Sequence, residues 1–135
     1  MAALFPDKVI VQTGKTKYET QIKAGVHTLI ADEPKDLQGT DLGPNPNQLL
    51  ASALGACTAI TIRMYADRKE MPLDKVEIQL EIDKIAPDNH KVFRTVVLIG
   101  NLTADERDRL LKVANACPVH KLLSGTIEIE TSLGE

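Results

Sequence analysis

The sequence contains no tryptophan, and only two tyrosines and two phenylalanines occur among its 135 residues. It also lacks an excess of positive charge: 16 lysines and arginines stand against 19 aspartates and glutamates, which gives a formal net charge of −3. Proteins that bind nucleic acids use a basic face and aromatic side chains on which bases stack. The shortage of both argues against that function, and we expect no nucleic acid among the partners of this protein.

Targeting signals and long uninterrupted apolar runs are missing too. The N-terminus has no basic segment followed by an apolar one, as a secretory signal would. The most apolar stretch, 46–62, is interrupted by Arg63 before it reaches the length of a membrane span. We therefore expect a soluble, cytoplasmic protein with no membrane partner. In that compartment Cys57 and Cys117 are expected to be reduced, catalytic or buried, and not to form a structural disulfide.

Several signatures of catalytic sites are absent as well. The chain has no glycine-rich phosphate-binding loop, no serine nucleophile elbow and no paired carboxylates. The signal for a metal site is weak: Cys117 and His120 have Cys-x-x-His spacing, but zinc sites normally show two such close pairs. Three other residues are conceivable further ligands: Cys57, His27 and His90. We expect no metal site.

The most prominent segment that is present is a long helix predicted over 46–69. Asn45 is a good N-cap, and Pro46 falls at the first helical position, where its missing N–H has no consequence. No strong stop follows until Met71 and Pro72. Its residues are small or apolar on every side, which predicts a central helix buried on all sides. Because one chain of this length has few elements to surround such a helix, we expect a partner chain to complete its burial.

Three segments flank this helix. Residues 1–31 contain three β-rich runs separated by glycine turns, which predict a three-stranded meander. Residues 32–45 are rich in Asp, Gly, Pro and Asn, and predict a loop leading into the helix. Residues 73–135 predict a ββαβ half. The order βββ-α-ββ-α-β, with strands in runs, indicates an α+β fold with a largely antiparallel sheet, in a single domain over 1–135.

The ββαβ half has its own local signals. Residues 75–85 alternate strictly between apolar and polar side chains, which is typical of a half-buried strand. Residues 92–99 return as a more continuously apolar strand. Thr103 and Glu106 have the spacing of a capping box and mark the start of a second helix. A last strand is predicted over 126–131.

The two cysteines leave alternatives open. Cys57 and Cys117 fall on the apolar faces of the two predicted helices, whose packing could bring them together. Free buried cysteines are often small apolar residues, but two thiols that converge from two elements are also suited to form a reversible disulfide. Cys117 ends one helix and precedes Pro118 at the start of another, so the two helix ends act on its pKa in opposite directions. His120 and Lys121 follow within a turn and could supply positive charge.

Three stretches resemble the OsmC/Ohr family, whose names stand for osmotically induced protein and organic hydroperoxide resistance protein. They are 43–50 (Gly-Pro-Asn-Pro-Asn-Gln-Leu-Leu), 53–58 (Ala-Leu-Gly-Ala-Cys-Thr) and 116–120 (Ala-Cys-Pro-Val-His). The resemblance covers nearly the whole chain in element order. The Asp-Glu-Pro loop at 32–34 and Met-Tyr-Ala at 64–66 are similar to a less-characterised OsmC-like branch.

The resemblance implies an intertwined homodimer with two sites at the subunit interface, in a bacterial protein of the oxidative-stress response. It also implies a thiol-dependent hydroperoxide reductase. Cys57 would attack an organic hydroperoxide as the peroxidatic thiolate and become a sulfenic acid, and Cys117 would resolve it as a disulfide. A dithiol such as a dihydrolipoyl group, or a small thiol, would then reduce the pair. No metal or organic cofactor is implied.

The chain departs from the family pattern at two positions. Family peroxidases pair the reactive cysteine with an arginine from the N-terminal strands and a glutamate at the start of the helix, whereas the first arginine here is Arg63. Asn47, or in a variant branch Gln48, stands where that glutamate belongs, and an uncharged amide cannot anchor a cation as a carboxylate does. Asn47 and Gln48, with His120 and Lys121, are the residues we expect at the binding site.

Two hypotheses follow from these departures. In the first, a cation reaches Cys57 from elsewhere, and a partner chain is the better source. The candidates within this chain are Arg63, Arg68, Arg94 and Lys121. In the second, Cys57 stays a neutral thiol, and the protein is a non-catalytic OsmC-like member that binds a small apolar or electrophilic ligand at the dimer-interface pocket. A purely structural dimer module is a third class.

Overall fold

The computed structural model describes residues 1–134. The chain divides into two compact units, Met1–Leu50 and the part from Ala51 onward. Each unit has its own contacts and is described by itself. The expectation that 1–135 forms a single domain stays a prediction.

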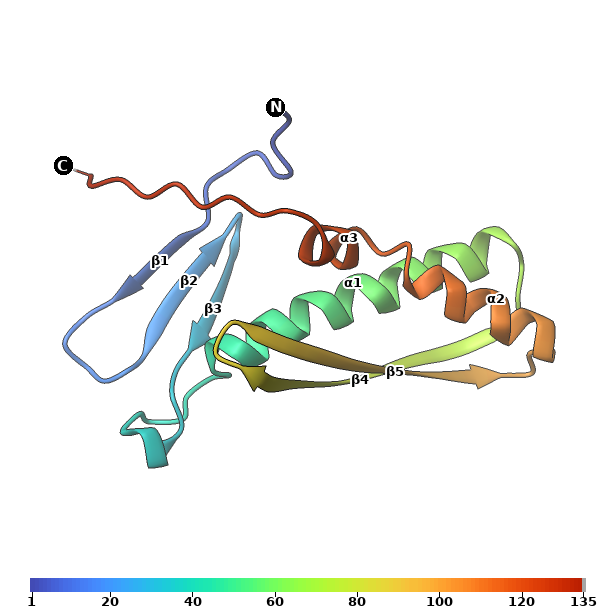
Figure 1. Ribbon diagram of the computed structural model, residues 1–135, viewed down its shortest axis with the longest axis horizontal. Coiled ribbons are helices and arrows are strands. Elements are labelled where there is room, and N and C mark those ends of the chain that lie inside the picture. The colour runs from blue at the N-terminus through green and yellow to red at the C-terminus, as the bar shows by residue number, and fades with distance from the viewer. Residues whose placement is uncertain (135) are drawn as a thin grey trace. The chain divides into compact units, whose positions relative to one another are not determined.

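The first unit contains the predicted meander. Strands β1 (Ile10–Thr13), β2 (Thr20–Ala24) and β3 (His27–Ala31) pair antiparallel in that order (Figure 1). The last pair of partners in the β2–β3 register leaves a two-residue turn that starts at Gly25, whose φ of 62° lies in the left-handed region where glycine has no steric penalty. The three-stranded meander predicted from the sequence is confirmed.

A single buried carboxylate organises the loop that follows β3. This loop holds a short 3-10 helix, η1 (Lys35–Leu37). Asp32 Oδ1 accepts hydrogen bonds from the backbone N–H groups of Tyr18 at 3.0 Å, Glu33 at 2.7 Å and Thr40 at 3.4 Å. Its Oδ2 accepts from Leu42 N–H at 3.3 Å. Burial alone would raise the pKa of Asp32, but these four donors outweigh it and lower the pKa.

Helix α1 (Pro46–Arg68) begins where the sequence predicts and ends one residue earlier. Its first turn is held by reciprocal hydrogen bonds: Asn45 N–H donates to Gln48 Oε1 at 2.9 Å, and Gln48 N–H donates to Asn45 Oδ1 at 2.8 Å. One face is buried, through Leu54, Gly55, Thr58, Ile62 and Ala66. The opposite face is exposed in the single chain, and burial on all sides therefore still depends on the predicted partner.

By length and apolar composition alone, α1 is long and apolar enough to cross a membrane, contrary to the length estimate drawn from Arg63, but one such helix is weak evidence for a membrane span. The core helix of a soluble protein passes the same test. Five of the 23 residues of α1 are buried by packing within this chain.

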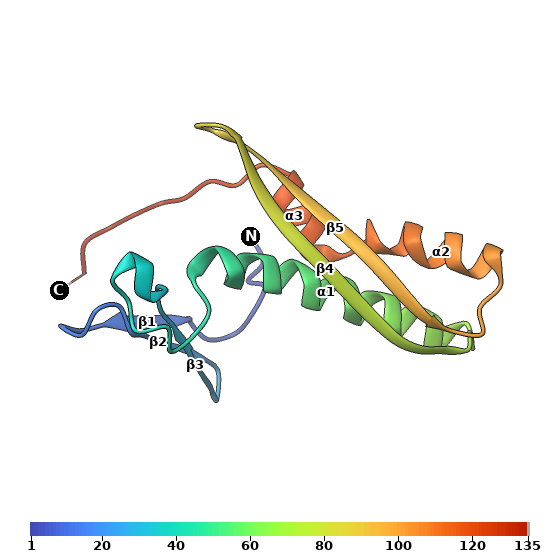
Figure 2. The same ribbon diagram turned by 90° about the horizontal axis from the view of Figure 1, so that it is seen from below.

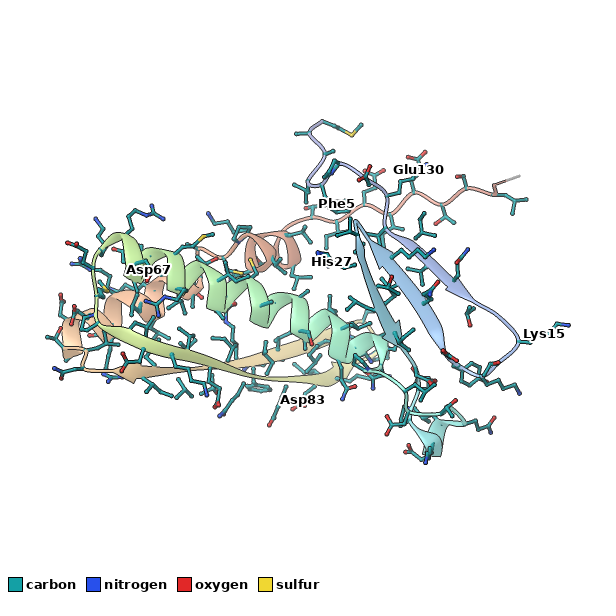
Figure 3. The ribbon with its side chains drawn as sticks, turned by 180° about the vertical axis from the view of Figure 1, so that it is seen from behind. Phe5, Lys15, His27, Asp67, Asp83 and Glu130 are labelled. Atoms are coloured by element: carbon teal, nitrogen blue, oxygen red, sulfur yellow. The ribbon has the colours of Figure 1, made fainter. Side chains whose placement is uncertain are left out.

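Strands β4 (Leu73–Ala86) and β5 (Asn89–Gly100) form one long antiparallel hairpin. The helices of the second unit lie on one face of it (Figures 1 and 2). As predicted, alternate residues of β4 are partly covered on that face, and the polar ones, such as Asp83, lie on the outer face (Figure 3). Helix α1 approaches the hairpin closely at Gly55, where an added Cβ would lie 2.7 Å from Leu80 Cδ1.

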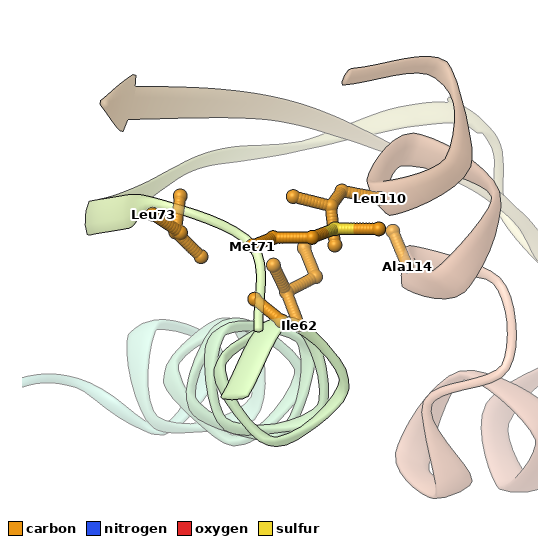
Figure 4. Close-up of a cluster of buried hydrophobic side chains, with 6 residues drawn as sticks. Ile62, Met71, Leu73, Leu110 and Ala114 are labelled. Atoms are coloured by element: carbon orange, nitrogen blue, oxygen red, sulfur yellow. The ribbon is translucent and has the colours of Figure 1, made fainter. Parts of the chain in front are cut away.

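Helix α2 (Ala104–Ala114) starts with the predicted capping box, in which Glu106 N–H donates to Thr103 Oγ1 at 3.1 Å and Thr103 N–H donates to Glu106 Oε1 at 2.9 Å. Its apolar face packs on α1 and on the start of the hairpin. The buried core so formed is shown in Figure 4 and consists of Ile62, Ala66, Met71, Leu73, Leu110 and Ala114. This core holds α1, α2 and the hairpin together and so fixes the elements that carry both cysteines.

The end of the chain differs from the prediction at one element. After α2, a short helix α3 (Pro118–Ser124) forms as expected, but residues 126–134 adopt neither helix nor strand. The reason is that a strand needs a neighbour for its N–H and C=O groups, and β4 and β5 form a two-stranded sheet. The α+β class with antiparallel sheets is confirmed.

Candidate active site

Helix α1 and the turn before α3 bring the two cysteines together. Cys57 is half-buried in the middle of α1, and Cys117 is fully buried at the N-cap of α3. Pro118 at the first position of α3 directs the chain so that Val119 N–H points at Cys57 Sγ, at 3.5 Å. Helix α2 ends at Ala114, three residues earlier than the prediction that placed Cys117 at its end. Cys117 therefore belongs to the start of α3.

Both cysteines are free, and the Cys57 thiol donates a hydrogen bond to Cys117. Burial raises the pKa of Cys57, and Cys117 raises it further as a hydrogen-bond acceptor and as a neighbouring negative charge. Burial would also raise the pKa of Cys117, but hydrogen bonds from the Cys57 thiol, the backbone N–H groups of His120 and Val119 and the Thr58 hydroxyl lower it. The first negative charge of the pair therefore resides mainly on Cys117.

An arginine from β5 lies next to this pair. Arg94 Nη1 donates to Thr58 Oγ1 at 3.1 Å, and Nη2 contacts Asn115 Oδ1 and His120 Nδ1, each at 3.0 Å. Thr58 is fully buried, and its hydroxyl lies 3.7 Å from Cys117 Sγ and 2.7 Å from the Leu54 carbonyl oxygen. Thr58 thus connects the guanidinium of Arg94 to the sulfur of Cys117.

Strand register explains why Arg94 points inward. Arg94 is paired with Leu80 across the antiparallel hairpin, and directly opposite residues of such a pair project to the same face. Leu80 faces Gly55 of α1, so Arg94 also projects toward the helices. Its neighbours on that face, Val96 and Leu98, pack on the hydrophobic core.

A cavity of about 380 Å³ opens beside Arg94. Three of its lining residues are apolar and three are polar: Leu54, Val92 and Leu123, and Arg94, His120 and Ser124. Arg94 Nη2 can only donate, so in this contact His120 Nδ1 is the acceptor. The site therefore combines two thiols, one guanidinium and an apolar pocket within the second unit.

The residues predicted for binding are placed in different surroundings. His120 lies at the site through its contact with Arg94. Asn47 and Gln48 are exposed in the first turn of α1, where Gln48 serves the N-terminal capping described above. Lys121 is exposed on α3, and its backbone N–H donates to the Cys117 carbonyl oxygen at 3.2 Å.

Of the predicted cations, Arg94 is the one whose guanidinium reaches the thiol site. Arg63 instead pairs with Asp67, one turn further along α1, and donates to the Leu73 carbonyl oxygen at 2.6 Å. Thr58 and Asn115 were missed by the sequence reasoning. The sequence does contain a signal for Arg94. It stands between Val92 and Val96 on the side of the strand expected to face inward, and a charge placed there is costly unless it has polar partners.

Within residues 1–134, no group of three or more His, Cys, Asp or Glu side chains converges as a metal site would require. Cys57 lies beside Cys117, but these two thiols and His120 do not form such a group.

The family model described as "OsmC-like protein" matches residues 39–132. The chain belongs to the OsmC-like protein family. Over 136 aligned positions it is 25% identical to the organic hydroperoxide resistance protein OhrB of Bacillus subtilis (strain 168), and the alignment covers 97% of this chain and 98% of that protein. The family resemblance inferred from the sequence motifs is confirmed.

Solved structures of OsmC-like proteins have a fold similar to that of this chain. The structure of OhrB from Bacillus subtilis superimposes with a TM-score of 0.63 at 26% identity, and the match covers 91% of this chain and 93% of that one. An OsmC-like protein from Mycoplasma pneumoniae matches with a TM-score of 0.77 at 18% identity, over 91% of this chain and 90% of that one. These likenesses support the OsmC-like fold, and the OhrB relative is itself named for organic hydroperoxide resistance.

Proposed function

We propose that this chain is a thiol-dependent hydroperoxide reductase that acts on organic hydroperoxides, with Cys57 as the peroxidatic and Cys117 as the resolving thiol. The observation that carries the proposal is the direct contact between the two thiols beside a pocket that presents Arg94. Relatives named for organic hydroperoxide resistance add support. Two thiols in contact can form a disulfide without large movement of the chain.

Because Cys117 carries the negative charge of the thiol pair before the reaction, it also serves as the acceptor for the Cys57 proton. Cys57, which is the more exposed of the two, reaches a hydroperoxide more easily but holds its proton in the resting pair. Transfer of this proton to Cys117 across their hydrogen bond produces the Cys57 thiolate. The thiolate attacks the terminal peroxide oxygen, the S–O bond forms, the O–O bond breaks, and an alkoxide leaves. The alkoxide takes the proton from Cys117 and departs as the alcohol.

Resolution then completes the cycle. The regenerated Cys117 thiolate attacks the sulfur of the Cys57 sulfenic acid, the S–S bond forms, and the S–O bond breaks. The hydroxide that leaves takes a proton from solvent and becomes water. The hydroperoxide is thereby reduced by two electrons, and the dithiol is oxidised to a disulfide. A dithiol such as a dihydrolipoyl group, or a small thiol, returns two electrons and two protons by thiol–disulfide exchange.

Arg94 takes the place of the arginine that the family draws from its N-terminal strands. Its guanidinium donates to the Thr58 hydroxyl, which lies 3.7 Å from Cys117 Sγ, and it lines the pocket that we assign to the departing alkoxide. Asn115 and His120 hold the guanidinium, a task that the family assigns to a glutamate. Neither of these partners is a carboxylate, so the positive charge of Arg94 is not compensated by an ion pair with them.

The thiol stoichiometry of the two cysteine variants tests this function. We expect one equivalent of an alkyl hydroperoxide to consume both thiols of the wild type, and Cys57→Ser to lower the rate by several orders of magnitude because the nucleophile is gone. Cys117→Ser is expected to consume one equivalent and then to gain further oxygen on Cys57, up to the sulfinic acid. Mass spectrometry and thiol titration measure both. Turnover by Cys57→Ser at the wild-type rate would show that the proposal is wrong.

We also propose that the protein works as a cytoplasmic homodimer. The exposed apolar face of α1 supports the dimer, since it carries Ile60 and Met64 at 54% and 60% exposure in the single chain. Both lie on the same helix as Cys57, so a second copy that covers them would enclose the site.

A further inference from the structure

We propose that two threonine hydroxyls of α1 decide which thiol carries the negative charge of the pair. The hydroxyl of Thr58 stabilises the thiolate of Cys117. The hydroxyl of Thr61 stabilises the thiolate of Cys57. Both threonines are positioning residues, because they act on the sulfurs and not on a hydroperoxide. The inference rests on the proposed function where it concerns reaction rates, whereas the location of the charge can be measured without any hydroperoxide.

The contacts of Thr58 place its hydroxyl between a cation and a sulfur. Thr58 is fully buried, and its hydroxyl lies 3.7 Å from Cys117 Sγ and 2.7 Å from the Leu54 carbonyl oxygen, so its single proton has two possible acceptors. Its oxygen accepts from Arg94 Nη1 at 3.1 Å. Such a bond polarises the hydroxyl and strengthens it as a donor. A charged sulfur attracts the proton more strongly than a neutral carbonyl oxygen does, so the hydroxyl favours the Cys117 thiolate.

Thr61 has the corresponding place beside the other thiol. It follows Cys57 by four positions in α1, and residues at this spacing are neighbours on one face of a helix. Burial raises the pKa of Cys57 most, Cys117 adds to this, and a hydrogen bond from the Thr61 side chain opposes both. Thr61 is half-buried, whereas Thr58 is fully buried. The deeper hydroxyl therefore serves the thiolate that predominates, and the shallower one serves the thiolate that reacts.

Two ionisable side chains from other elements also face this site within residues 1–134. They are Arg94 from β5 and His120 from α3, whose side chains are in contact at 3.0 Å. The residues that α2 contributes to the adjoining core, Leu110 and Ala114, are apolar. Arg94 is connected to Cys117 through the Thr58 hydroxyl. A serine at position 58 keeps this connection, and a valine breaks it.

The two hydroxyls have different consequences for the reaction rate. The Cys57 thiolate is the reactive form, but the Cys117 thiolate predominates once the pair has lost one proton. Without the Thr58 hydroxyl, the pair loses this proton at higher pH, and a larger share of the ionised pair is the Cys57 thiolate. Without the Thr61 hydroxyl, the reactive form alone is destabilised. The rate then falls at every pH, while the midpoint stays almost unchanged.

Titration of single-cysteine variants is the first test. In Cys57→Ala, we expect Thr58→Val to raise the pKa of Cys117 by about one unit, the usual effect of one hydrogen bond to a charged group. Valine keeps the methyl group of threonine and lacks its hydroxyl, and serine does the reverse, so Thr58→Ser should leave the pKa in place. Carbon-13 NMR of cysteine labelled at Cβ reports the charge even on a buried sulfur. Equal shifts in both variants would indicate a packing effect and overturn the inference.

The same titration in Cys117→Ala tests Thr61. We expect Thr61→Val to raise the pKa of Cys57, by less than the shift at Cys117 because this hydroxyl is only half-buried. Thr61→Ser should restore the pKa. Thr95→Val removes a hydroxyl from the exposed outer face of β5 and is the control, which should leave both thiols unchanged. An unchanged Cys57 in Thr61→Val would overturn the division of roles between the threonines.

The pH profile of alkyl hydroperoxide reduction in the protein with both cysteines is the second test. For Thr58→Val we expect the midpoint to rise by about one unit, the rate constant above the midpoint to increase by up to about tenfold, and the rate constant well below it to stay the same. For Thr61→Val we expect a severalfold lower rate constant throughout and the same midpoint. A rate constant lowered equally at every pH in both variants would overturn the inference.

The two tests together separate this inference from the proposed function. If the titrations shift as expected but no thiol is oxidised by the hydroperoxide, the proposed function fails and the assignment of the hydroxyls stands. If the hydroperoxide is reduced but the threonine variants titrate as their parents do, the inference fails and the proposed function stands.

Discussion

The hydroxyl of Thr58 lies between the guanidinium of Arg94 and the sulfur of Cys117, at 3.1 and 3.7 Å. A hydroxyl has one proton, and that of Thr58 is shared between the Leu54 carbonyl oxygen at 2.7 Å and the Cys117 sulfur, while its oxygen accepts from Arg94. The same sulfur receives hydrogen bonds from the Cys57 thiol and from the backbone of α3. These contacts lower the pKa of the fully buried Cys117, whereas the pKa of the more exposed Cys57 is raised.

The coupling between the thiols predicts reciprocal shifts in alanine variants. Cys117→Ala should lower the pKa of Cys57, because it removes both the acceptor of its hydrogen bond and the neighbouring negative charge. Cys57→Ala should raise the pKa of Cys117, because the strongest of the hydrogen bonds that stabilise its thiolate is lost. The pH dependence of the iodoacetamide alkylation rate at each remaining cysteine measures these values. Shifts in the same direction for both variants would contradict the coupling.

At the scale of elements, the register of the β4–β5 hairpin and the fold of the 32–45 loop each depend on a few residues. Register places Arg94 opposite Leu80 and so on the helix-facing side. In the loop, Asp32 gathers four backbone N–H groups that have no strand or helix to satisfy them. A carboxylate accepts several such bonds at once, which a neutral side chain of similar size cannot do.

The lowered pKa of Asp32 predicts that the loop is sensitive to acid. Since the pKa is lower in the folded than in the unfolded state, the stabilisation is fully present above the unfolded value of about 3.9 and is lost as the pH falls through the folded value. Amide hydrogen exchange at Thr40 and Leu42 should accelerate over this range. Asp32→Asn should accelerate it already at neutral pH. Asp36→Asn, in the exposed 3-10 helix, is the control and should leave exchange unchanged.

At the scale of the whole molecule, the exposed apolar face of α1 is the feature that bears on how the chain assembles. One face of the helix packs on the chain, and the other exposes Ile60 and Met64. Large apolar side chains gathered on one face of a helix are typical of a surface that another protein covers. We propose that a second copy of this chain covers it.

Sedimentation velocity at micromolar concentration tests the dimer. The wild type is expected to sediment as a dimer, and Met64→Glu is expected to weaken association at least about a hundredfold, because burying an unpaired carboxylate costs several kcal/mol. Leu111→Glu makes the same change at an exposed leucine of α2 and should not affect association. A monomeric wild type would show that the exposed face of α1 has another use.

Much of the fold follows from local patterns in the sequence. Asn45 and Pro46 start α1, Thr103 and Glu106 start α2, and strict alternation predicts β4, because each of these signals acts between residues close in the chain. The strand predicted over 126–131 does not form. Its alternating pattern is local, but a strand also needs a neighbouring strand to accept and donate its backbone hydrogen bonds. The motifs around Cys57 and Cys117 sufficed to indicate the OsmC-like family.

The surroundings of the thiols were decided by tertiary structure alone. Thr58 and Cys117 are 59 positions apart in the sequence, Cys57 and Val119 are 62 apart, and Arg94 is 36 from Thr58. No local pattern relates residues at such separations, because their contacts depend on hairpin register and on the packing of α1 against β5 and α3. The sequence by itself determined which side chains exist to do the chemistry. Packing decided that Arg94, and not Arg63 or Lys121, lies beside them, and that Cys117 carries the first charge.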